Sequence, residues 1–116
     1  EMYRAPTERL QRVAGAFVDW GIPTSASIRY CRRAAPDMPI IASGGISNGI
    51  DVAKAIALGA QLAGIAGDFL RAADKSGVAG VIELAETVTD ELRVAMFSSG
   101  AAGIEALAQT PLHTDY

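Results

Sequence analysis

Two adjacent glycines, Gly44 and Gly45, are the residues whose type and spacing best suit binding chemistry in this sequence. They follow a short apolar run and are followed by Ile46, Ser47 and a helix-like stretch. Glycines tolerate positive φ and let backbone N–H groups approach a ligand without a Cβ in the way. With the first N–H groups of a following helix, they form a cradle for an anion, most often phosphate. The alternative is a tight βα turn with a purely structural role.

A second pair of small residues, Ala66 and Gly67, ends the next apolar run and again opens a helix. In (β/α)₈ barrels, the loops after the last two strands often build a phosphate site together. Two consecutive strand ends of this kind favour such a site. The stretch 43–51 does not match the G-x-G-x-x-G fingerprint of Rossmann folds. It is not a Walker A loop either, because no Gly-Lys-Ser/Thr follows.

The elements that position these loops are predicted by hydrophobic periodicity and by helix caps. The runs 38–43 and 62–66 have the unbroken apolar character of short, buried parallel strands. Thr7 and Asn48 are suited to cap helix N-termini, and Gly21 is suited to end a helix. The order strand–helix–strand–helix implies a parallel sheet. The spacing predicts helices over 7–20, 25–35, 48–58, 68–75, 80–98 and 103–109.

Composition places the chain among ordinary folded domains. It has 116 residues, 50% of them hydrophobic, and a net charge of -3. This acidic balance argues against nucleic-acid binding, and no apolar run approaches the roughly 20 residues of a membrane span. The single cysteine, Cys31, excludes an internal disulfide and an all-cysteine zinc site, and it fits a reducing, cytoplasmic compartment.

Two predicted strands are too few for a complete α/β fold, because a parallel sheet needs cover on both faces. We therefore expect an α/β fold in which residues 1–116 form the C-terminal part of one (β/α)₈ TIM barrel domain. That part comprises the last two strands plus helices, and the chain is expected to be incomplete. The exposed strand edges of such a piece predict oligomerisation or aggregation in isolation.

The segments PIIASGGI at 39–46 and NGIDVAKAIALGA at 48–60 resemble the seventh-strand region of FMN-dependent (β/α)₈ barrel enzymes. That pattern is shared by the lactate and glycolate oxidase group. The upstream DWGIPT at 19–24, with Met96, Phe97 and Gly100, is more specific. With it the chain resembles the type 2 isopentenyl-diphosphate delta-isomerases, as the C-terminal third of that enzyme.

The resemblance implies an FMN-dependent isomerase that interconverts isopentenyl and dimethylallyl diphosphate, with reduced FMN as acid/base. It also implies Mg²⁺, NADPH as reductant, and a homo-oligomer, tetramer or octamer, with no nucleic-acid or membrane partner. The family's catalytic residues and Mg²⁺ ligand lie upstream, so neither is predicted in this chain. The cofactor-binding residues carried over by position are Gly44, Gly45, Ile46, Ser47, Ala66 and Gly67, with Gly44 shaping the turn.

Two departures from the family pattern bear on phosphate binding. Related flavin barrels often carry Arg near Ser47 or Gly67, and here no basic residue is found at either point. Asp68 follows Gly67 where such families commonly have Pro. An acid beside a phosphate opposes its binding unless the side chain turns away to cap its own helix.

Two other functions stay open at this point. Another FMN barrel, such as a hydroxy-acid oxidase or a dihydroorotate or glutamate-synthase type, predicts a catalytic His or Arg just before the Gly-Gly strand. Residues 34–43 contain neither, and the nearest are Arg32 and Arg33. The other alternative is a non-catalytic phosphate-ligand or assembly module.

Several further side chains have both a functional and a structural interpretation, and we expect the structural one in each case. The functional alternatives are a ligand surface at Trp20, a nucleophile at Cys31, a metal site made by the acidic residues and a diphosphate site made by the basic ones. We expect packed positions for Trp20 and Cys31, a surface pair for Lys54 with Asp51, a solvated tail for His113, and solvated faces for Arg29, Arg32, Arg33, Glu83, Glu86, Asp90 and Glu91.

Overall fold

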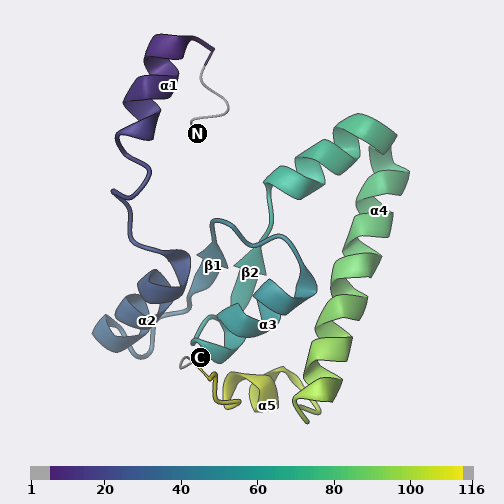
Figure 1. Cartoon of the computed structure of the whole chain (residues 1–116). Coiled ribbons are helices and arrows are strands. Elements are labelled where there is room, and N and C mark those ends of the chain that lie inside the picture. Colours follow the sequence, from purple (N-terminus) through teal and green to yellow (C-terminus); the bar gives the residue numbers. More distant parts are fainter. Residues whose placement is uncertain (1–5, 114–116) are drawn as a thin grey trace.

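The computed structural model, which describes residues 6–113, contains a two-stranded parallel sheet with helices packed beside it (Figure 1). Its elements, in chain order, are α1 (Glu8–Gly15), α2 (Thr24–Ala34), β1 (Ile41–Ser43), α3 (Gly49–Ala57), β2 (Leu62–Gly64), α4 (Gly67–Ser98) and α5 (Ile104–Ala108). The strand–helix–strand–helix order predicted from the sequence is confirmed.

The two strands pair directly and in parallel, with α3 as the crossover between them. Ala42 lies opposite Ala63, and Ser43 lies opposite Gly64. Both strands are shorter than the predicted runs 38–43 and 62–66. Just before β1, the N–H of Ile40 donates to the side-chain oxygen of Gln61 at 2.7 Å rather than to a backbone carbonyl oxygen.

The two faces of this sheet differ in their cover. Ala42 is 3% exposed and packs with Ile28 of α2 and Ala55 of α3. Ile41 and Leu62, a register pair whose side chains point to the opposite face, are 65% and 60% exposed. Burial of the strands, predicted for both faces, is therefore found on one face of the described structure.

Helix α4 is bent at Gly77, whose φ of 58° and ψ of -146° interrupt the helix. This is the break predicted between the helices at 68–75 and 80–98. Figure 1 shows the segment before the bend running outward from β2 and the longer segment after it returning alongside α3. Ala53 and Ile56 of α3 pack there with Leu107 of α5. Among the described residues, no helix is both long enough and apolar enough to cross a membrane.

The first predicted helix, 7–20, is too long, because α1 ends at Gly15 and turns follow it. Its cap is confirmed, since the Thr7 hydroxyl accepts the N–H of Leu10 at 3.3 Å. Trp20, predicted to pack in the core, is 80% exposed and contacts the ring of Phe17 edge-on. The apolar face of α1 has no packing partner in the described structure, and a short helix without one is not extended by its own propensity.

Helix α2 also departs from the predictions at two positions. Cys31, expected at a packed position, is exposed. Arg32, expected on a solvated face, instead braces the backbone around the sheet. Its guanidinium donates to the carbonyl oxygen of Gly59 at 2.7 Å and to that of Pro36 at 2.6 Å. It also donates to the carbonyl oxygen of Met38 at 2.9 Å. One side chain thus ties α2 to the segments entering both strands.

We expect Arg32→Ala to lower the free energy of unfolding by about 2 kcal/mol, because it leaves three backbone carbonyl oxygens, of which that of Gly59 is partly buried, without their charged donor. Urea denaturation followed by circular dichroism measures this change. Arg33→Ala is the matched control, since Arg33 neighbours Arg32 on α2 and is exposed. Equal effects of the two substitutions would contradict the bracing role.

Candidate functional site

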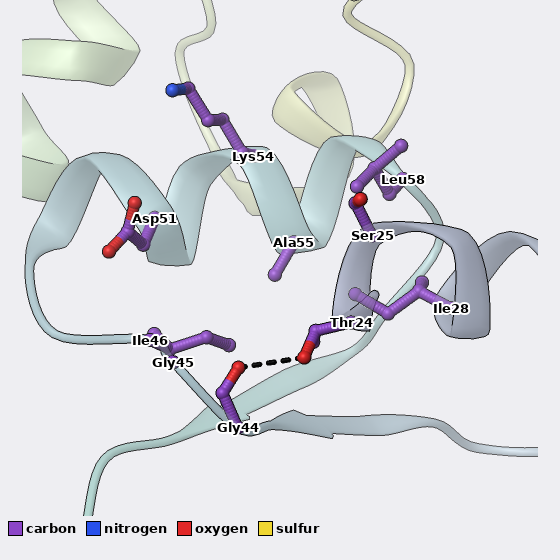
Figure 2. Close-up of a pocket in the computed structure, with 10 residues that line it drawn as sticks. All are labelled: Thr24, Ser25, Ile28, Gly44, Gly45, Ile46, Asp51, Lys54, Ala55 and Leu58. Carbon is purple, nitrogen blue, oxygen red and sulfur yellow. Dashed lines mark hydrogen bonds between the residues drawn. The ribbon is translucent and has the colours of Figure 1, made fainter. Parts of the chain in front are cut away.

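The turn after β1 has the geometry predicted for adjacent glycines. Gly44 has a φ of 100° and Gly45 a φ of 74°, both in the region that favours glycine. The hydroxyl of Thr24, at the start of α2, donates to the carbonyl oxygen of Gly44 at 2.8 Å (Figure 2). A Cβ on Gly44 would lie 3.2 Å from that hydroxyl oxygen. The turn is therefore held from α2, and Gly44 shapes it.

Gly45 and Ile46 supply the next two backbone N–H groups of the turn. A Cβ on Gly45 would meet no atom within 4 Å. In the described part of the chain, no hydrogen bond engages the N–H of Gly45 or Ile46. These two donors are available to an anion.

The start of α3 is already occupied by acceptors from the protein itself. The Asn48 side chain accepts the N–H of Asp51 at 2.8 Å, which confirms the predicted cap. The carboxylate of Asp51 accepts the N–H of Ser47 at 3.2 Å and its hydroxyl at 3.3 Å. The carboxylate of Glu91 accepts the N–H of Gly49 at 2.6 Å. Two negative charges therefore lie at this helix end.

The Glu91 contact was not foreseen, because the sequence indicated a solvated face. No local signal points to it, since the partners are 42 positions apart. The predicted pair of Lys54 with Asp51 is also wrong. Asp51 binds Ser47 instead, and Figure 2 shows Lys54 extending away from the Gly44–Gly45 turn.

The second strand end places Gly67 as the first residue of α4, and no side chain caps this helix at Ala66. A Cβ on Gly67 would lie 3.3 Å from a guanidinium nitrogen of Arg71. The carboxylate of Asp68 pairs with the same guanidinium and does not cap the helix. A basic side chain therefore does lie near Gly67, and its signal in the sequence was the i,i+4 spacing of Gly67 and Arg71 on one helix face.

A pocket of about 170 Å³ lies between α2, α3 and the Gly44–Gly45 turn (Figure 2). Ile28, Ala55 and Leu58 supply apolar walls, and Thr24 and Asp51 are among its polar residues. Pockets that hold a whole cofactor usually measure about 300–1,000 Å³. This pocket by itself is therefore smaller than such a site.

Among the described residues, no three His, Cys, Asp or Glu side chains lie close enough together to hold a metal ion. Glu83, Glu86 and Asp90 of α4 are exposed, as predicted, and so is His113.

Residues 14–114 match the sequence profile of FMN-dependent dehydrogenases. The chain belongs to this family. Its match to the family covers both strand ends described above, so the turn at Gly44–Gly45 and the start of α4 lie within a flavin-enzyme framework.

Similar curated proteins are isopentenyl-diphosphate delta-isomerases, as the resemblance predicted. The protein of this name from Xanthobacter autotrophicus is 51% identical over 93% of this chain and 31% of its own length. Those from Cronobacter sakazakii and Rickettsia felis are 46% and 41% identical over 94% and 97% of the chain. The chain spans about 31% of the length of the first of these relatives.

A solved structure shares the fold. It is a mandelate oxidase variant with a monooxide FMN adduct, and it is 29% identical to this chain with a TM-score of 0.75. The match covers 79% of this chain and 30% of the oxidase. The predicted fold class is thereby confirmed: the described residues form an α/β portion of a (β/α)₈ barrel.

Proposed function

We propose that this chain is part of an FMN-dependent isomerase that interconverts isopentenyl and dimethylallyl diphosphate, and that it supplies part of the FMN-phosphate site. The observation that carries the proposal is the 51% identity to an isopentenyl-diphosphate delta-isomerase over 93% of the chain. Membership of a family of FMN-dependent enzymes supports the cofactor.

The residues of the two strand ends fit a phosphate group. The N–H groups of Gly45 and Ile46 are unengaged within the described residues, and the space above Gly45 is open. Gly67 opens α4 beneath the guanidinium of Arg71. Backbone donors at a glycine turn and a helix start, with one cation, are the usual elements of phosphate recognition.

The remaining cofactor residues have distinct roles in this proposal. Gly44 shapes the turn that Thr24 holds, and Ala66 keeps the second strand end small. Ser47 contributes its N–H only after exchanging the Asp51 carboxylate for phosphate. Reduced FMN, when bound, would supply the acid/base chemistry at the allylic carbons of the substrate.

The rest of the enzyme completes the proposal. Mg²⁺, NADPH as reductant, a cytoplasmic location and a homo-oligomer follow from the proposed family function. In this proposal the Mg²⁺ ligand and the catalytic residues lie outside this chain.

A hydroxy-acid oxidase is the second candidate, since the mandelate oxidase shares the fold. That function requires a catalytic His or Arg just before the Gly-Gly strand. The stretch 34–43 contains neither, and the nearby Arg32 is engaged by backbone carbonyl oxygens. The sequence identity of this chain to the mandelate oxidase is also lower, at 29%, than its identity of 51% to the Xanthobacter isomerase.

The visible absorbance spectrum of the protein from the longest reading frame containing this sequence tests the function. We expect flavin bands, and a spectral change when isopentenyl diphosphate is added to the reduced protein. A flavoprotein reduced by a 2-hydroxy acid would favour the oxidase. A colourless protein that takes up no added FMN would refute the flavin site and favour a non-catalytic module.

The open space at Gly45 gives a second prediction. We expect Gly45→Ala to weaken FMN affinity at least about tenfold, because the added methyl group fills the space proposed for phosphate. Flavin fluorescence quenching on titration measures the dissociation constant. Gly100→Ala is the matched control, since Gly100 has the same φ of 74° and equally open surroundings. Similar losses in both variants would assign the effect to backbone strain alone.

The Arg71 guanidinium gives a third prediction for this site. We expect Arg71→Ala to weaken FMN binding about fivefold to tenfold, with a shallower dependence on salt, because one phosphate-facing charge is removed. The same titration at two ionic strengths measures this effect. Arg93→Ala removes an arginine from the equivalent i,i+3 pair with Asp90 and should leave affinity unchanged. An unchanged salt dependence in Arg71→Ala would exclude a contact with phosphate.

A further inference from the structure

Helix α4 reaches the cofactor loop through one side chain, that of Glu91. Its carboxylate accepts the N–H of Gly49 at 2.6 Å, and the contact is partly buried. Gly49 is the first residue of α3 and directly follows the loop that contains Gly45, Ile46 and Ser47. The position of Glu91 thus bears directly on where this loop ends and the helix begins.

The backbones of α3 and α4 are unusually close at this point. Gly49 is buried, and a Cβ there would clash with the backbone of Val88 and Leu92. The absence of a side chain lets the Gly49 N–H come within reach of an acid one turn along α4. Because Gly49 needs no positive φ, this close approach is the physical reason for a glycine here.

The same contact decides which donors remain for an anion. The free N–H groups at the amino end of a helix attract anions and carboxylates alike. Glu91 takes that of Gly49, and Asp51 takes that of Ser47. Two donors at the amino end of α3 are thereby engaged, and those of Gly45 and Ile46, one step earlier in the loop, are among the donors that no described group engages.

We propose that Glu91 is a positioning residue for the cofactor loop, which fixes the 44–49 turn by binding the first amide of α3. This inference rests on the proposed function, since it concerns the same phosphate site. Glu91 touches neither cofactor nor substrate in this role. It acts through Gly49, and what matters is the reach of its acceptor oxygen rather than its charge.

Two conservative substitutions separate reach from charge. Glu91→Gln keeps an acceptor oxygen at the same reach and removes the charge, whereas Glu91→Asp keeps the charge and withdraws the oxygen by one methylene. We expect Glu91→Asp to weaken FMN affinity about tenfold, the effect of losing a helix-end acceptor. We expect Glu91→Gln to bind FMN at least as tightly as the unsubstituted protein.

Hydrogen exchange in the flavin-free protein provides the second readout. In the protein from the longest reading frame, we expect a peptide covering 44–52 to exchange faster in Glu91→Asp and unchanged in Glu91→Gln. Glu86→Asp and Glu86→Gln are the matched controls, because Glu86 lies on the same helix and is exposed. Melting temperatures of all four variants separate local loosening from general loss of stability.

The outcomes are distinct. The positioning role would be overturned if Glu91→Asp kept the FMN affinity and the hydrogen-exchange rate of the unsubstituted protein. It would also be overturned if Glu91→Gln lost as much FMN affinity as Glu91→Asp. A protein that takes up no FMN before substitution would refute the proposed function instead. In that case the exchange comparison still decides whether Glu91 holds the loop.

Discussion

The contact of α3 with α4 at Gly49 is the constraint on which the rest of the site depends. A residue with a side chain at this position would force the two helices apart, because the backbone of α4 occupies the space. The loop between β1 and α3 is anchored at one end by Thr24 on the Gly44 carbonyl oxygen and at the other by Glu91 on Gly49. Between these two anchors, the amides of Gly45 and Ile46 keep a fixed direction without partners among the described residues.

The sheet itself relies on a different kind of contact. With only three residues in each strand, ladder hydrogen bonds contribute little fixation, and the small Ala42 admits α3 close to the sheet. The guanidinium of Arg32 compensates by binding carbonyl oxygens on the segments that enter β1 and β2. The opposite face, with Ile41 and Leu62 exposed, has the character of a barrel interior rather than of a surface.

Much of this architecture could be predicted from local patterns in the sequence. The apolar runs, the caps at Thr7 and Asn48, and the break at Gly77 depend on residues close together in the chain, so periodicity and capping rules predict them. The contacts of Arg32 with Gly59 and of Glu91 with Gly49 join residues 27 and 42 positions apart. Only the tertiary fold brings such partners together. Trp20 was predicted wrongly for the related reason that the described structure contains no partner for the apolar face of α1.

Charge at the two strand ends follows a consistent arrangement. Asp51 and Glu91 hold the start of α3, so an anion placed there would meet two carboxylates. At the start of α4, Asp68 is paired with Arg71, whose guanidinium lies over Gly67. An exposed pair of this kind contributes little to stability, so its geometry matters more than its energy. Asp68 partly neutralises the charge of Arg71. The pair also holds the Arg71 guanidinium on the side of α4 where the backbone of Gly67 lies. In the proposed site, a phosphate between the two strand ends would meet the donors of Gly45 and Ile46 and the pre-oriented guanidinium of Arg71. The proposal therefore does not require an arginine in the glycine turn itself.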